Sequence, residues 1–197
     1  MSNARLVRQI EFLAEADKLK TIVRRTPLTD GSRLENSAEH TWHVSLAAIA
    51  LLEYAPGVDM LRVLEMIAVH DLVEIDAGDT FAYDPDGQVH LTKNDRERAA
   101  AERVFGLLPP DQAAVLKSRW EEFEAMETPE SRYANALDRL QALLQNVRAG
   151  GGSWREHGVN RSQVLKRMAP VEAALPEVWP FVAEVIDRFC AAGAIRE

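Results

Sequence analysis

The residues best able to do chemistry lie in an apolar stretch, IAVHDLVEIDAGDT, which runs from Ile67 to Thr80. His70, Asp71 and Glu74 stand among its apolar residues, and ionisable side chains are seldom buried without a partner. The periodicity predicts a helix, on which His70 and Glu74 lie one turn apart, at i and i+4. The three side chains indicate metal binding or acid–base chemistry, whereas a partly buried histidine beside a surface aspartate is the commoner arrangement.

Two more segments supply residues of the same types. EHTWH places His40 and His43 one turn apart at the start of an otherwise apolar helix, and ALDRLQALL places Asp138 among leucines. A buried aspartate requires a cation or hydrogen bonds. Because Cys190 is the one cysteine, a thiolate site is excluded, and the set of imidazoles and carboxylates favours a transition metal. We expect one divalent metal ion, with Mn, Co, Fe, Ni, Zn and Mg left open.

Helical periodicity of apolar residues extends over nearly the whole chain, and almost nothing alternates like a strand. Predicted helices include the segments 6–13, 44–51, 61–72, 94–108, 110–127 and 129–149, with two more between 162 and 192. Asn36 and Glu39 form a predicted capping box, and Pro129 suits a first helical turn. The prediction is all-α: a single domain over residues 1–197, with its core in 5–190 and about seven to nine helices.

The segment DTFAYDPDGQVHLT, residues 79–92, is predicted to be a loop, with Pro85 and Gly87 at its tip. Loops of this length in compact domains are often lids or binding loops, and ordinary surface excursions are the alternative. Phe81 and Tyr83 are available in it to stack on a nucleobase.

Lys18, Lys20, Arg24 and Arg25 form a basic island in DKLKTIVRRTPL. Basic residues at the C-terminal end of a helix complement the helix dipole, so the residues alone favour a solvated helix end here.

Composition narrows the possible functions. The 197 residues are 47% hydrophobic and 27% charged, an ordinary globular balance, and the formal net charge is -8. A net negative charge disfavours nonspecific binding of a nucleic-acid polymer. The apolar runs are shorter than a membrane span, and the polar first residues do not resemble a signal peptide. We expect a cytoplasmic protein without a membrane partner.

The order of His40, the pair His70–Asp71 and the later Asp138 resembles the H...HD...D signature of the HD-domain phosphohydrolases. RTPLTDGSRLENSAEHTWHVSLAA, HDLVEIDAGD and ALDRLQ are similar to the subgroup that contains bacterial 5'-deoxynucleotidases. The resemblance implies an HD-domain helical bundle and a metal-dependent phosphomonoester hydrolase. Its expected substrate is a (deoxy)ribonucleoside 5'-monophosphate, attacked by a metal-activated water. The family's habit also implies a homodimer.

The resemblance carries roles to individual positions. The residues that match the family's metal ligands are His40, His70, Asp71 and Asp138. Arg25 matches an arginine that contacts the substrate phosphate, and a guanidinium can bind phosphate oxygens in a bidentate manner. Glu74 and Asp79 match acidic residues beside the metal, with Glu74 expected as general acid or base and Asp79 as a ligand for water or a sugar hydroxyl.

At two positions the resemblance assigns no role. His43 matches no ligand of the family, and we expect it either to line the substrate pocket or to be an internally satisfied histidine. Thr26 stands where the deoxynucleotidases carry a tryptophan implicated in rejecting the ribose 2'-hydroxyl, so a deoxyribose preference is not predicted.

The sequence is compatible with other functions. A second possibility is a phosphohydrolase whose substrate is another small phosphate ester, a cyclic nucleotide or a nucleoside triphosphate. A nucleotide-binding regulatory module without turnover is a third possibility. A helical interaction protein whose His70 and Asp71 serve core packing is the fourth.

Overall fold

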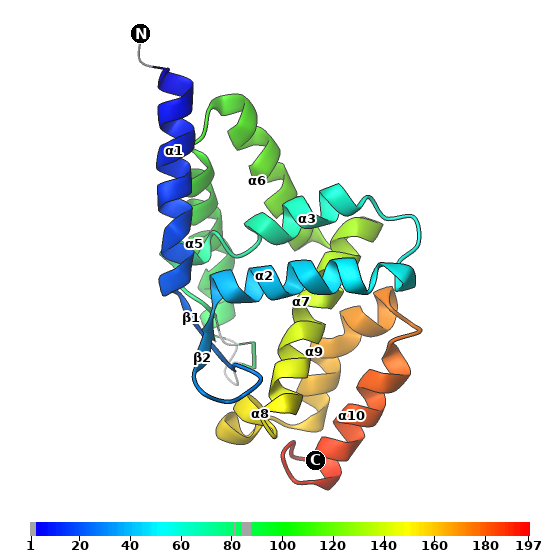
Figure 1. The fold of residues 1–197 in the computed structure, drawn as a ribbon. Coiled ribbons are helices and arrows are strands. Elements are labelled where there is room, and N and C mark those ends of the chain that lie inside the picture. The colour runs from blue at the N-terminus through cyan, green and yellow to red at the C-terminus, as the bar shows by residue number, and fades with distance from the viewer. Residues whose placement is uncertain (1–2, 81, 84–87) are drawn as a thin grey trace.

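Three helices that cross at the middle of the molecule organise the fold (Figure 1). The computed structural model describes residues 3–80, 82–83 and 88–197. The crossing helices are α2 (Ser37–Ala50), α3 (Met60–Val69) and α7 (Pro129–Arg148). With them pack α8 (Gly152–His157), α9 (Arg161–Ala174) and α10 (Trp179–Ala191). Their buried side chains form the first of two hydrophobic clusters.

The second hydrophobic cluster lies beside the first and has its own helices. These are α1 (Ala4–Ala16), the 3-10 helix η1 (Asp17–Thr21), α5 (Gln88–Phe105) and α6 (Pro110–Ala125). Met66 and Ile67 belong to the first cluster, whereas Val69 and Leu72 belong to the second. His70 and Asp71 therefore lie where the two clusters meet.

The described residues form ten α-helical segments, of which α4 and α8 have only 4 and 6 residues, and the all-α prediction is confirmed. The short antiparallel pair of β1 (Val23–Pro27) and β2 (Leu34–Asn36) was not predicted. It replaces the predicted helix end around Arg24 and Arg25. A short 3-10 helix, η2 (Leu52–Tyr54), follows α2.

The start of α2 agrees with the prediction. The Asn36 side chain accepts a hydrogen bond from the Glu39 backbone N–H at 3.0 Å, and the Glu39 carboxylate accepts one from the Asn36 N–H at 3.2 Å. This capping box satisfies two backbone donors of the first turn. Because β2 ends where α2 begins, the cap also fixes the place of His40 in the first turns of the helix.

Two predicted element boundaries were wrong. The helix expected to run through Glu74 ends at Val69, and α4 (Glu74–Ala77) starts separately. Gly78 closes α4 with a φ of +74°, a conformation that favours glycine. The predicted loop 79–92 is shorter than expected because α5 begins at Gln88, and its predicted tip, Pro85 and Gly87, lies outside the described residues.

No helix in the described parts of the chain is both long enough and apolar enough to cross a membrane.

Tyr133 joins α7 to α2 through a buried hydrogen bond. Its hydroxyl donates to the Ala48 carbonyl oxygen at 2.8 Å, and its side chain is 1% exposed. We expect Tyr133→Phe to lower the free energy of unfolding by about 1 kcal/mol, because one buried hydrogen bond is lost. Denaturant unfolding followed by circular dichroism measures this. Tyr54→Phe is the matched control, because the Tyr54 hydroxyl has no hydrogen-bond partner among the described residues. Equal losses in both variants would contradict the assignment.

Candidate metal centre and its cavity

His40 of α2 and Asp138 of α7 face each other at the centre of the helix crossing. Nε2 of His40 lies 2.9 Å from Oδ1 of Asp138, and His40 is fully buried. Burial and the charge of Arg24 lower the pKa of His40, but hydrogen bonds to Asp138 and Glu35 and the charge of Asp71 raise it to about 9. Burial would raise the pKa of Asp138, yet the hydrogen bond to His40 and the charge of Arg167 hold it well below its ordinary value. The surroundings therefore stabilise positive charge at this point.

His70 presents a nitrogen without a partner to the same point. Its Nδ1 donates to the Ile67 carbonyl oxygen at 2.7 Å, which leaves Nε2 as the ring nitrogen that faces the cluster. Nε2 is buried, and no described residue forms a hydrogen bond with it. It lies 3.1 Å from Oδ1 of Asp71. An imidazole nitrogen and a carboxylate oxygen this close together can bind the same cation.

Four predicted metal ligands thus come together from three segments of the chain. Single ligand atoms of His40, His70 and Asp138 all lie within 4.8 Å of one another, and all three residues are buried. Asp71 joins them through Oδ2, which lies 4.0 Å from His40 Nε2. Imidazole nitrogens and carboxylate oxygens are the ligands that divalent transition metals take in proteins, and a backbone carbonyl that accepts from the second ring nitrogen, as Ile67 does for His70, is a usual outer support for such a ligand. The residues present fit a divalent metal.

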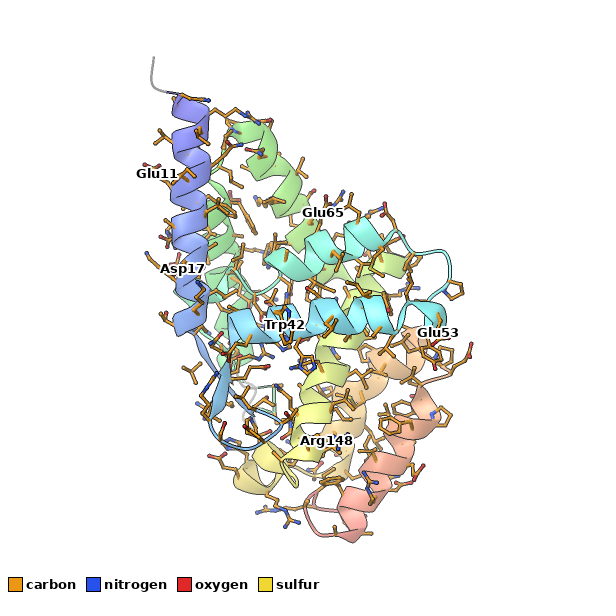
Figure 2. The ribbon with its side chains drawn as sticks, viewed as in Figure 1. Glu11, Asp17, Trp42, Glu53, Glu65 and Arg148 are labelled. Atoms are coloured by element: carbon orange, nitrogen blue, oxygen red, sulfur yellow. The ribbon has the colours of Figure 1, made fainter. Side chains whose placement is uncertain are left out.

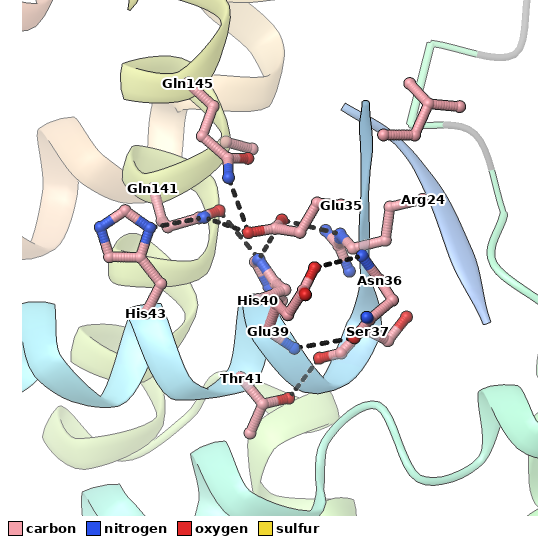
Figure 3. A network of polar contacts seen from close by, with 12 residues as sticks. Arg24, Glu35, Asn36, Ser37, Glu39, His40, Thr41, His43, Gln141 and Gln145 are labelled. Atoms are coloured by element: carbon pink, nitrogen blue, oxygen red, sulfur yellow. Dashed lines mark hydrogen bonds and ion pairs between the residues drawn. The ribbon is translucent and has the colours of Figure 1, made fainter. Parts of the chain in front are cut away.

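A buried polar layer lies behind His40 (Figure 3). Oε1 of Gln141 accepts from His40 Nδ1 at 2.8 Å, and Gln141 Nε2 donates to Oε1 of Glu35 at 3.0 Å. Gln145 also donates to that oxygen, at 2.6 Å, while the other Glu35 oxygen lies 3.5 Å from His40 Nδ1. Glu35 is 1% exposed, so this layer is dry enough to set both the tautomer and the ring orientation of His40.

Arg24 is the guanidinium that faces the cluster. Its Nη1 donates to Oδ2 of Asp71 at 3.0 Å, and its other nitrogens lie 3.8 Å from Glu35 and 3.9 Å from Asp138. Burial lowers the pKa of Arg24, but the charges of Asp71, Glu74 and Asp138 raise it above its ordinary value. The residue described from sequence as part of a helix end is therefore a fixed counter-charge of the site.

Glu74 and Asp79 lie beside the cluster, as the resemblance implied. The Ser37 hydroxyl donates to Oε2 of Glu74 at 2.6 Å. Burial and the charge of Asp71 raise the pKa of Glu74 well above its ordinary value, against the opposing charge of Arg24. Burial also raises the pKa of Asp79, against Arg24. Carboxyl groups with raised pKa values can hold a proton near neutral pH.

One cavity connects these groups. Its walls include His70, Asp71, Glu74, Asp79 and Asp138, together with basic, aromatic and small residues. The cavity is also lined by Arg24, Arg25, Thr26, Tyr83, Lys93, Arg139 and Arg167. The cavity therefore combines a metal-binding cluster with several positive side chains.

Two predicted substrate contacts have different positions. Arg25 lines the cavity and is exposed. His43 is not among the described lining residues; its Nδ1 accepts from Gln141 Nε2 at 3.0 Å, behind the metal cluster. In the predicted loop, Tyr83 lines the cavity and its hydroxyl accepts from Trp154 Nε1 at 3.3 Å, whereas Phe81 lies outside the described residues.

The family assignment follows from this pattern and from a direct match. A family model described as HD domain matches residues 16–179. The chain belongs to the HD-domain family. The His70–Asp71 pair is the part of the site that corresponds to the family's name.

Two solved structures resemble the chain over most of its length. A predicted metal-dependent phosphohydrolase from Magnetospirillum magnetotacticum MS-1 has a solved structure with a TM-score of 0.92 and 47% sequence identity, covering 99% of this chain and 100% of that one. A conserved hypothetical protein from Pyrococcus furiosus, at 24% identity and a TM-score of 0.61, shares the fold; that match covers 89% of this chain and 98% of the other.

Curated relatives carry the name 5'-deoxynucleotidase. HDDC2 of Homo sapiens is 26% identical over 179 residues, 89% of this chain and 83% of that protein. The hdd1 protein of Schizosaccharomyces pombe is 25% identical over 153 residues, 74% of each chain. HDDC2 of Danio rerio is 28% identical over 111 residues, 56% of this chain, and the match spans about half of that protein, 54%.

Sequence reasoning missed several residues of this HD-domain site. Arg24 could have been found from strand alternation, since it is half-buried between exposed Val23 and exposed Arg25. Gln141 lies three residues after Asp138 on α7, on the same helical face. Glu35 offered no signal, because a glutamate before a helix cap is usually exposed.

The layer behind His40 predicts an effect on metal affinity. We expect Glu35→Gln to weaken divalent-metal binding by about tenfold or more, because the carboxylate that supports His40 and Arg24 loses its charge. Calorimetric titration of the metal-free protein with Mn²⁺ or Zn²⁺ measures the affinity. Glu53→Gln, an exposed carboxylate after α2, is the control and should bind like the wild type. Unchanged affinity in Glu35→Gln would refute a supporting role.

Proposed function

We propose that this HD-domain protein is a divalent-metal-dependent phosphohydrolase that removes phosphate from deoxyribo- or ribonucleoside 5'-monophosphates. The observation that carries the proposal is the convergence of His40, His70, Asp71 and Asp138 beside a cavity that also contains arginines. The names of the curated relatives support the nucleotide, and the phosphohydrolase from Magnetospirillum magnetotacticum MS-1 supports the reaction class.

His40, His70, Asp71 and Asp138 would hold the metal ion. When bound, the ion supplies a Lewis acid that neutralises phosphoryl charge and makes water a stronger nucleophile. Mn, Co, Fe, Ni, Zn and Mg remain the possible ions, and two imidazole ligands favour the transition metals among them over Mg. Gln141 and Glu35 keep His40 in position for this task.

Glu74 is proposed to move the proton. Its carboxyl group lines the cavity, is fixed by Ser37 and has a raised pKa, so it can take a proton from attacking water or return one to the leaving oxygen. Hydrolysis of a phosphomonoester consumes one water and yields an alcohol and inorganic phosphate. Glu74 would carry the proton from the attacking water to the leaving oxygen of the alcohol.

Arg25 and Asp79 are proposed substrate-binding residues. Arg25 would neutralise nonbridging phosphate oxygens, and Asp79 would accept a hydrogen bond from water or a sugar hydroxyl. Tyr83 offers an aromatic side chain at the cavity wall for the nucleobase. His43 contacts Gln141 and not the cavity, so it would act on the site indirectly, by helping Gln141 to hold His40. A lid formed by the segment that contains Tyr83 also remains a proposal.

We also propose a cytoplasmic homodimer. Trp42, Leu46 and Ile49 lie at i, i+4 and i+7 on α2 and are 66%, 49% and 59% exposed. Trp42 stands on the outward side of this helix (Figure 2). A second copy covering this stripe would remove apolar surface from water, which supports association. The net charge of -8 and the small cavity support small phosphorylated partners over nucleic-acid polymers or membranes.

The direct test is phosphate release from all deoxyribo- and ribonucleoside monophosphates with several divalent metals. Asp71→Ala should lose metal and activity together, because it removes a ligand. Glu74→Gln should keep the metal and lose activity by about a hundredfold or more, because it removes only the proton carrier. Bound metal is measured by atomic absorption.

Equal rates in wild type and both variants would exclude this function. Nucleotide binding without phosphate release would favour a regulatory module, and release from diesters or triphosphates alone would favour another phosphohydrolase.

Arg25 predicts a separate kinetic effect. Arg25→Gln should raise KM for a nucleoside monophosphate by about tenfold or more, because a charge-assisted contact to phosphate is lost. Steady-state assays at several substrate concentrations measure KM and kcat. Lys20→Gln, an exposed charge from the same basic segment, is the control with an unchanged KM. If both variants show the same KM as wild type, Arg25 does not hold the phosphate.

A further inference from the structure

Arg139 and Arg167 are two cavity residues without a part in the proposed reaction. They come from α7 and α9, which pack side by side (Figure 1). Their side chains are 12% and 29% exposed. Both guanidinium groups are thus largely withdrawn from bulk water and line the same cavity as the metal cluster.

One carboxylate faces both arginines. Arg167 Nη2 lies 3.4 Å from Oδ2 of Asp138, and Arg139 Nη1 lies 3.8 Å from the same oxygen. Oδ1 of Asp138 is already engaged by His40 at 2.9 Å and lies 3.9 Å from Arg24. A single negative charge is therefore shared among three guanidinium groups and an imidazole.

The positive charge at this wall is only partly compensated. The contacts of Arg139 and Arg167 with Asp138 are long, at 3.8 and 3.4 Å, and Asp138 is also engaged by His40 at 2.9 Å. Two largely buried guanidinium groups that share one carboxylate in this way attract a further anion.

Arg139 is also fixed in place. Its Nη1 donates to the carbonyl oxygen of Asn135 at 2.8 Å and to Oδ1 of the same residue at 2.7 Å. A guanidinium held by its own helix loses little conformational entropy when it binds an anion. Arg167 lines the cavity and, among the described residues, forms a hydrogen bond with Asp138 at 3.4 Å.

We propose that Arg139 and Arg167 form an anion-binding pair that holds a phosphate group at the α7–α9 wall of the cavity, next to Asp138. The pair is distinct from Arg25, which comes from β1. That the phosphate is the one released from a substrate rests on the proposed function. Binding of inorganic phosphate itself requires only the pair.

Calorimetric titration of the full-length protein with inorganic phosphate, at saturating divalent metal, tests the pair. Wild type should bind phosphate, and Arg167→Gln should weaken binding by about tenfold or more, because a charge-assisted hydrogen bond is lost. Arg139→Gln should weaken it in the same direction. The controls, Arg148→Gln on α7 and Lys166→Gln on α9, change exposed charges of the same helices and should bind like wild type. Thermal unfolding checks that each variant folds.

The outcomes separate this inference from the proposed function. Wild-type protein that binds no phosphate, or an Arg167→Gln variant that binds it as tightly as wild type and as both controls, overturns the pair. If phosphate binding falls in Arg167→Gln but the wild type hydrolyses no nucleotide, the pair stands and the proposed function fails. If nucleotides are hydrolysed while both arginine variants keep wild-type phosphate affinity, the function stands and the pair is wrong.

Discussion

The buried contact between His40 and Asp138 is the interaction on which the rest of the site depends. It joins α2 to α7 at the point where the helices cross, so the two helices must pack correctly before the cluster exists. Neither side chain would be tolerated there alone, because an unpaired buried charge costs several kcal/mol. The same requirement explains the polar layer around them, in which Gln141 accepts a hydrogen bond from the second nitrogen of His40 and the Glu35 carboxylate lies 3.5 Å from that nitrogen. Fold and site are therefore specified by the same residues.

Charge balance gives the site its second constraint. Asp71, Glu74, Asp79 and Asp138 border one cavity, and burial together with the charge of Asp71 raises the pKa of Glu74 and of Asp79. Arg24 offsets part of it through its contact with Asp71. A divalent cation among the four proposed ligands would offset more, and Nε2 of His70, which has no hydrogen-bond partner among the described residues, faces the same point. The charge of the acidic cluster is thus suited to a bound cation.

The sequence predicts the helices and the close grouping of His40, His70 and Asp138 because both depend on local or compositional signals. His and Asp in apolar helices are unusual enough to be noticed, and capping at Asn36 is a short-range pattern. The features that the sequence could not predict depend on contacts between distant segments. The strand that carries Arg24 is stabilised only by pairing with β2, and the buried state of Glu35 comes from Gln141 and Gln145, more than a hundred residues later. The break after Val69 was missed because the apolar pattern continues through it.

The distribution of charge supports the proposal of a small anionic substrate. The whole chain carries a formal charge of -8, yet Arg24, Arg25, Arg139 and Arg167 all border the cavity. At physiological ionic strength the field of distant surface carboxylates is screened beyond about 8 Å, so a small phosphate inside the cavity responds mainly to the nearby arginines. A polyanion would lie along the outer surface as well and meet its negative charge. Local attraction combined with overall repulsion would therefore favour a phosphate ester small enough to enter the cavity, such as the proposed nucleoside monophosphate, over a nucleic-acid polymer.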